Sequence, residues 1–172
     1  MAKILIAYYS RRGENYVNGS IKKLPLGNTE VVAAKIKALL PEADMFQIDT
    51  VRHYSDSYMT CIEEAKQELR EQARPEMKEK LESIDQYDTI ILGYPNWWST
   101  MPMVCYTFLE SYDFSGKTII PFCTNEGSGM GSSERFIKKL CPTANVLSGV
   151  PIHGAEAANA DREAQQIANM AK

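Results

Sequence analysis

The spacing of apolar positions changes several times along this chain, and each change marks a predicted element. Residues 3–9 form a continuous apolar run that ends in a polar loop, which is typical of a strand buried on both faces of a parallel sheet. From Asn28 the apolar residues recur at the spacing of a helix, and Pro41 ends that helix. The chain therefore opens with a strand and a helix joined by a long polar segment.

The same alternation continues to the end of the chain. Apolar runs predict four further strands, at residues 43–48, 88–94, 117–123 and 145–147. Four helices are predicted to start at the capping-box pattern of residues 60–63, at Pro102, at Ser132 or Ser133, and at Asp161. A short helical turn is also expected at residues 77–84. This alternation favours an α/β three-layer sandwich, in which helices cover both faces of a doubly wound, five-stranded parallel sheet. Residues 1–172 are expected to form a single domain.

In sheets of this kind, ligands bind beyond the carboxyl ends of the strands. The loop after the first strand begins with Ser10 and closes with Gly27, Asn28 and Thr29 at the start of the helix. Hydroxyls, amides and free backbone N–H groups at a helix N-terminus form a phosphate site without a lysine. The alternative interpretation is that Asn28 or Thr29 only caps the helix.

An insertion interrupts this first loop. The pair Asn18-Gly19, flanked by apolar residues, is the strongest short-range signal for a β-hairpin. We therefore expect a small hairpin at residues 16–26. Whether it covers a ligand or decorates the surface is left open by the sequence.

The loops after the third and fourth strands complete a candidate pocket. Residues 94–102 contain Trp97 and Trp98. Adjacent side chains diverge, so it is difficult to bury both rings in the core, and a planar ligand would cover the ring that stays exposed. Residues 124–132 contain three glycines, which allow close backbone approach to a ligand but lack the spacing of a dinucleotide motif. The three loops together predict one pocket for a phosphate, an aromatic plane and a polar ring edge.

Composition narrows the classes of function. The formal net charge is −3 and no basic block stands out, which argues against nucleic-acid binding. The longest apolar runs are too short to span a membrane and no signal-peptide pattern opens the chain, so we expect a cytoplasmic protein. The four cysteines are scattered without a C-x-x-C pair, which predicts reduced, buried thiols and no metal site.

In combination these segments resemble a known family. They are similar, in order and over essentially the whole chain, to flavodoxin-like FMN-binding proteins, and most of all to a short bacterial group with a tryptophan pair in the middle loop. The segments that carry the resemblance are Ile6-Ala-Tyr-Tyr-Ser10, Gly27-Asn-Thr29, Gly93-Tyr-Pro-Asn-Trp-Trp98 and Thr124-Asn-Glu-Gly-Ser-Gly129. The resemblance implies the strand order 2-1-3-4-5. The chain departs from the family in its hairpin insertion and in being only mildly acidic.

The resemblance also implies FMN as the cofactor. The FMN phosphate is expected at Ser10, Arg11, Asn15, Asn28 and Thr29. The isoalloxazine is expected between two loops, one formed by Pro95, Asn96, Trp97, Trp98, Ser99 and Thr100, and the other by Thr124, Asn125, Glu126, Gly127, Ser128 and Gly129. Because the flavin carries the chemistry, no catalytic acid–base residue is expected.

The function implied is electron transfer with FMN. We expect an oxidoreductase that acts on a small acceptor such as a quinone, with NAD(P)H as a candidate donor, and a monomer or homodimer. Residues 95–101 contain no glycine, so a peptide flip beside the flavin would be costly, which favours two-electron chemistry. Two alternatives stay open: a one-electron carrier that docks on redox protein partners, and a flavin-binding module without turnover.

Overall fold

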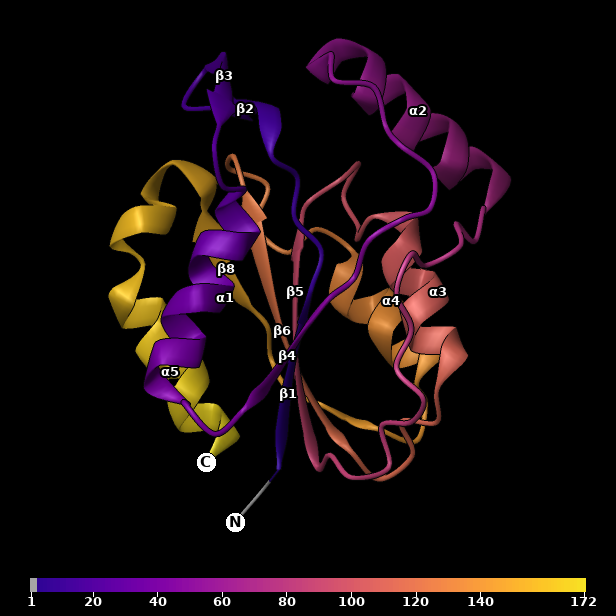
Figure 1. Cartoon of the computed structure of the whole chain (residues 1–172), viewed down its shortest axis with the longest axis vertical. Coiled ribbons are helices and arrows are strands. Elements are labelled where there is room, and N and C mark those ends of the chain that lie inside the picture. Colours follow the sequence, from indigo (N-terminus) through magenta and orange to yellow (C-terminus); the bar gives the residue numbers. More distant parts are fainter. Residues whose placement is uncertain (1–2) are drawn as a thin grey trace.

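The computed structural model of the chain describes residues 3–172 and contains a central parallel sheet (Figure 1). The strands lie in the order β4, β1, β5 and β6, and their bounds are Asp44–Gln47, Ile4–Tyr8, Thr89–Pro95 and Thr118–Asn125. Two short strands, β7 (Asn145–Val146) and β8 (Val150–His153), share the position beyond β6 and both pair with it in parallel. The α/β fold class is confirmed, and the strand order agrees with the predicted 2-1-3-4-5.

Helices cover both faces of this sheet (Figure 1). One face carries α1 (Asn28–Leu39) and α5 (Asp161–Ala171), and the other carries α3 (Met103–Ser111) and α4 (Ser133–Leu140). The remaining helix, α2 (Tyr58–Glu71), stands above the upper edge of the sheet in Figure 1, on the α3 side, and a 3₁₀ helix, η1 (Gly154–Asn159), follows β8. Within residues 3–172 there is no helix with the length and apolarity that a bilayer crossing requires.

The two helical layers explain why the central strands read as continuous apolar runs. Successive side chains of a strand point to opposite faces of the sheet. In β1, Leu5 and Ala7 pack into the core beneath α3, while Ile4, Ile6 and Tyr8 pack into the core beneath α1 and α5. Because both faces are buried, no polar alternation is left in the sequence of such a strand.

Several element boundaries differ from the prediction. Helix α2 begins at Tyr58 and not at residue 60, because the hydroxyl of Ser57 accepts the first-turn N–H group of Thr60. Residues 77–84 contain no helix, and Met77 instead forms an isolated antiparallel bridge with Thr50. The fifth strand position was expected at residues 145–147, but most of its pairing comes from β8, whose Pro151 obscured the strand pattern.

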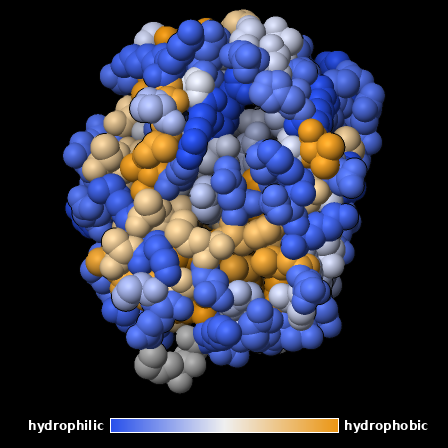
Figure 2. Space-filling model, viewed as in Figure 1, coloured by the Kyte–Doolittle hydropathy of each residue, from blue (hydrophilic) through white to orange (hydrophobic). Residues whose placement is uncertain are grey.

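The insertion in the first loop forms an antiparallel hairpin of β2 (Gly13–Val17) and β3 (Ser20–Leu24). Its two turn residues are Asn18 and Gly19, with φ angles of 52° and 88°, as a type I′ turn requires. The hairpin begins earlier than the expected residue 16, and it forms a separate two-stranded sheet beside the upper edge of the main one (Figure 1). In Figure 2, paler residues lie recessed between this hairpin and α2, among hydrophilic surroundings.

A close contact between the two central strands gives a test of the fold. A Cβ atom at Gly93 in β5 would overlap the ring of Phe122 in β6. We therefore expect Gly93→Ala to lower the free energy of unfolding by about 2 kcal/mol, because overpacking displaces a buried ring. The double variant Gly93→Ala/Phe122→Leu should lose about 1 kcal/mol less unfolding free energy than the sum of the losses in the two single variants. Urea denaturation measures all three losses. Strict additivity of the two changes would contradict this contact.

Candidate functional site

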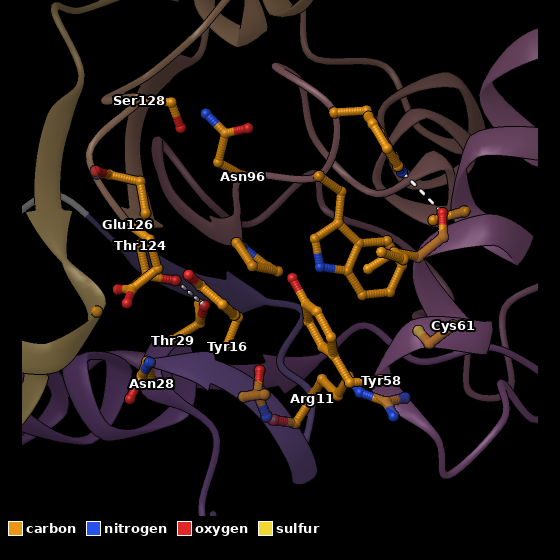
Figure 3. Close-up of a pocket in the computed structure, with 18 of the residues that line it drawn as sticks. Arg11, Tyr16, Asn28, Thr29, Tyr58, Cys61, Asn96, Thr124, Glu126 and Ser128 are labelled. Atoms are coloured by element: carbon orange, nitrogen blue, oxygen red, sulfur yellow. Dashed lines mark hydrogen bonds between the residues drawn. The ribbon is translucent and has the colours of Figure 1, made fainter. Parts of the chain in front are cut away.

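A cavity of about 380 Å³ lies at the carboxyl-terminal edge of the sheet, between the hairpin and α2 (Figure 3). Its volume falls within the range of small-molecule sites, about 300–1,000 Å³. Polar side chains from the loops after β1 and β6 gather on one side, and residues of α2 and the middle loop line the other. The cavity therefore has a polar end and an aromatic end.

The polar end lies at the N-terminus of α1. The hydroxyl of Ser10 accepts the backbone N–H of Glu30 at 3.1 Å, and the hydroxyls of Thr29 and Thr124 lie 2.8 Å apart. The first-turn N–H groups of a helix have no partner within the helix, and together with the helix dipole they favour an anion. Gly27 allows this approach, because a Cβ atom there would overlap the Ser10 hydroxyl and lie 2.6 Å from the carbonyl oxygen of Arg11.

One carboxylate stands close to this anion-favouring helix end. Glu30 lies in the first turn of α1, and both its oxygens accept hydrogen bonds from the Arg12 guanidinium, at 3.0 and 2.5 Å. This hydrogen bonding holds the pKa of Glu30 below its ordinary value. Arg12 thus offsets the negative charge of Glu30, which would otherwise oppose an anion at the helix end.

Arg11 and Asn15 line the cavity, and both side chains donate hydrogen bonds to backbone carbonyls. The Arg11 guanidinium donates to the carbonyl oxygens of Glu14 and Ser55, at 2.9 and 2.8 Å. The Asn15 amide donates to the carbonyl oxygen of Arg11 at 2.9 Å. Because these donors are directed at backbone carbonyls, the two side chains shape the loop and tie it to the segment before α2.

At the aromatic end, the two tryptophans diverge as the sequence suggested. The Trp97 ring is half-buried and meets Tyr9 and Tyr54 edge-on, with centroid distances of 5.2 and 5.4 Å. The Trp98 indole N–H donates to the carbonyl oxygen of Ile62 in α2 at 2.8 Å, and 42% of Trp98 stays exposed. Both rings line the cavity, and Trp97 is the more firmly held of the two.

The middle loop adopts a strained backbone conformation. Trp98 and Ser99 have φ angles of 56° and 70°, in the left-handed region that costs an ordinary residue about 1–2 kcal/mol. The Ser99 carbonyl oxygen accepts the N–H of Ser132 at 2.6 Å, and Asn96 accepts the N–H of Ser99 at 2.9 Å. A Cβ atom at Gly131 would overlap Ser99, so the third loop can approach this closely only with a glycine there. The surrounding loops thus hold the strained turn in place.

The structure brings most of the predicted cofactor residues to one cavity, and leaves three outside its lining: Thr100, Gly127 and Gly129. Thr100 is buried, and its hydroxyl lies 2.6 Å from the hydroxyl of Tyr106. Gly127 and Gly129 have positive φ angles and shape the third loop. A cofactor contact at these three residues stays a prediction.

Sequence reasoning missed several lining residues: Tyr16, Tyr58, Cys61, Ile62, Ala65 and Gly154. Four of them are spaced i, i+3, i+4 and i+7 along α2, which is the pattern of a helix face that packs on a core. The same spacing serves here to line a cavity. Burial raises the pKa of the Cys61 thiol, and all four cysteines are free and buried, as predicted.

Glu126 in the third loop connects the hairpin to the body of the molecule. One carboxylate oxygen accepts the backbone N–H of Asn18 in the hairpin turn at 2.5 Å, and the other lies 3.6 Å from the Nε2 atom of His153. A Cβ atom at Gly154 would lie 2.8 Å from this carboxylate, so the glycine leaves room for it. The hairpin tip is therefore held against the loop after β6.

Comparisons with known proteins point to one family. Residues 3–164 match the family model described as flavodoxin. Among solved structures, proteins described as flavoproteins from Bacteroides eggerthii and Bacteroides uniformis are 28% and 27% identical, with TM-scores of 0.75 and 0.74. The alignments cover 98% and 95% of this chain and 99% and 98% of theirs. A flavoprotein from Lactobacillus acidophilus NCFM, solved in complex with FMN, is 18% identical with a TM-score of 0.66 over 92% of this chain and 98% of that one. No curated protein sequence matches the chain.

The contact between Glu126 and the hairpin turn predicts a local change in amide protection. Removing the carboxylate by Glu126→Ala should speed hydrogen exchange at the Asn18 amide about five- to tenfold, because that N–H loses its charged acceptor. Glu134→Ala is the matched control, because it removes a carboxylate that accepts the Gly149 amide, outside the cavity. Equal Asn18 exchange in both variants, measured by NMR, would show that Glu126 does not hold the hairpin.

Proposed function

Since the chain belongs to the flavodoxin family, whose cofactor is FMN, we propose that it is an electron-transfer enzyme that passes two electrons from NAD(P)H to a small acceptor such as a quinone. The observation that carries this proposal is the two-ended cavity, which joins an anion-favouring helix N-terminus to an aromatic wall at the edge of the sheet. Each end matches one part of FMN.

The phosphate of FMN fits the polar end. The hydroxyls of Ser10 and Thr29 and the amide of Asn28 line the cavity beside the first turn of α1. Backbone N–H groups at a helix N-terminus bind a phosphate without a dedicated cation. Arg12 supports this role indirectly, since its bond to Glu30 offsets the negative charge of a carboxylate in the first turn of α1.

The flat ring system of FMN fits the aromatic end. Trp97 presents a ring that is fixed by two edge-on tyrosines, so that little conformational freedom is lost when a planar group stacks on it. Thr124, Asn125 and Ser128 supply polar groups from the opposite loop for the ring edge. These residues bind and orient the cofactor.

Bound FMN supplies reversible uptake and release of electrons and protons, which the side chains of the cavity do not provide. In the proposed overall reaction, NAD(P)H, a proton and a quinone give NAD(P)⁺ and a hydroquinone, so that two electrons and two protons reach the acceptor. The middle loop favours this two-electron course. Its Ser99 carbonyl is held by the Ser132 N–H, and a change of backbone conformation there would break that bond.

The aromatic wall yields a test of cofactor binding. We expect Trp97→Ala to weaken FMN binding about tenfold, because a preorganised stacking face is lost. Trp98→Ala is the matched control with a smaller effect, since Trp98 bonds to α2 and is more exposed. Quenching of FMN fluorescence during titration of the apoprotein gives both dissociation constants. Equal, negligible effects would mean that neither ring stacks on the flavin.

The enzymatic part of the proposal has its own test. Purified protein loaded with FMN should oxidise NADH or NADPH in the presence of 1,4-naphthoquinone, with one hydroquinone formed per nicotinamide consumed. The absorbance of the nicotinamide reports the rate, and apoprotein without added FMN is the control. FMN-loaded protein that exchanges electrons only with a redox protein, and not with the nicotinamide, would favour the carrier function instead.

A further inference from the structure

Two tyrosines from different elements meet at the cavity. Tyr16 of β2 and Tyr58 of α2 stack with their ring centroids 6.1 Å apart and their planes inclined by 26°. Both line the cavity, and Tyr16 remains 44% exposed. Within residues 3–172 neither phenol hydroxyl has a hydrogen-bond partner. The pair therefore offers a stacking surface and two free donors at the same place.

The hairpin holds this pair in position from two sides. The carboxylate of Glu14, two residues before Tyr16, accepts the backbone N–H of Tyr58 at 2.8 Å. At the other end of β2, the turn at Asn18 is bonded to Glu126. The hairpin thus connects the start of α2 with the loop after β6, and Tyr16 lies on the strand between these two contacts.

The surroundings of the pair are apolar on the α2 side. Ile62 and Ala65 follow Tyr58 along the same helix face, and Trp98 is bonded to the carbonyl oxygen of Ile62. Burial raises the pKa of the Tyr58 phenol, so its hydroxyl stays protonated and available as a donor. In Figure 3 the Tyr58 ring points from α2 into the cavity, toward the polar side chains on the opposite side.

We propose that Tyr16 and Tyr58 bind the electron acceptor, and that this acceptor is a small, planar ring bearing carbonyl groups. The facing sides of the two tyrosines already stack on each other, so the acceptor ring packs against the outer surface of the pair, and its carbonyl oxygens accept hydrogen bonds from the phenol hydroxyls. This inference rests on the proposed function, because it names the acceptor class for the same cavity. It also gives the hairpin insertion a role, because the hairpin supplies one of the two rings.

The test measures binding of 1,4-naphthoquinone to the oxidised, FMN-loaded protein by equilibrium dialysis, without any nicotinamide. We expect Tyr16→Ala and Tyr58→Ala each to weaken naphthoquinone binding about tenfold, and Tyr58→Phe to weaken it about threefold by removing only the hydroxyl. Ile21→Ala is the matched control, because Ile21 pairs with Tyr16 across the hairpin but does not line the cavity. FMN content should be unchanged in all variants.

The outcomes separate this inference from the proposed function. Naphthoquinone binding that is the same in wild type and in the tyrosine variants overturns the inference. Loss of FMN together with naphthoquinone also overturns it, since the tyrosines would then form a cofactor wall. If an alanine variant fails to fold, naphthoquinone binding is measured on Tyr16→Phe and Tyr58→Phe, which remove only the hydroxyls. Unchanged binding in both phenylalanine variants would then overturn the inference. Tyrosine-dependent binding without NAD(P)H oxidation would contradict the proposed function and leave the acceptor site standing.

Discussion

The contact of Gly27 with Ser10 and Arg11 is the constraint on which the site depends. The first loop spans the residues between β1 and α1 and contains a whole hairpin, yet its two ends meet because Gly27 has no side chain. Closing the loop at its base places Ser10 against the first turn of α1 and lets the hairpin project beyond it. Because loop-closure entropy grows only slowly with loop length, the inserted hairpin adds little to the free-energy cost of bringing these two ends together.

The core strands and the hairpin turn were predictable from the sequence, because each depends on local signals. Residues 4–8 and 90–94 contain no polar side chain apart from the tyrosine hydroxyls, since both faces of their strands are buried, and Asn18-Gly19 suits a turn with two positive φ angles. The contacts of Arg11 were not predictable, because its carbonyl acceptor at Ser55 lies far along the chain. The cavity-lining face of α2 was also hidden, since a helix that faces a cavity has the same spacing as one that faces a core.

The middle loop shows how neighbouring loops support a conformation that is unfavourable by itself. Two successive residues, Trp98 and Ser99, lie in the left-handed region without glycine. The Ser99 carbonyl reaches Ser132, and Gly131 leaves the space for that approach. A loop locked in this way holds Trp97 and Trp98 apart, one against the core and one against α2, and so keeps the aromatic wall rigid.

The hairpin also has a consequence for the behaviour of the protein in concentrated solution. It forms a sheet of two strands, so β3 has an edge whose backbone groups lack a strand partner in the residues described. Free edges of this kind recruit strands from neighbouring molecules and start aggregates. The exposed side chains of Lys22 and Lys23 on β3 place two positive charges along that edge, and two such edges repel each other. The element that extends the cavity thus carries its own protection against intermolecular β-sheet formation.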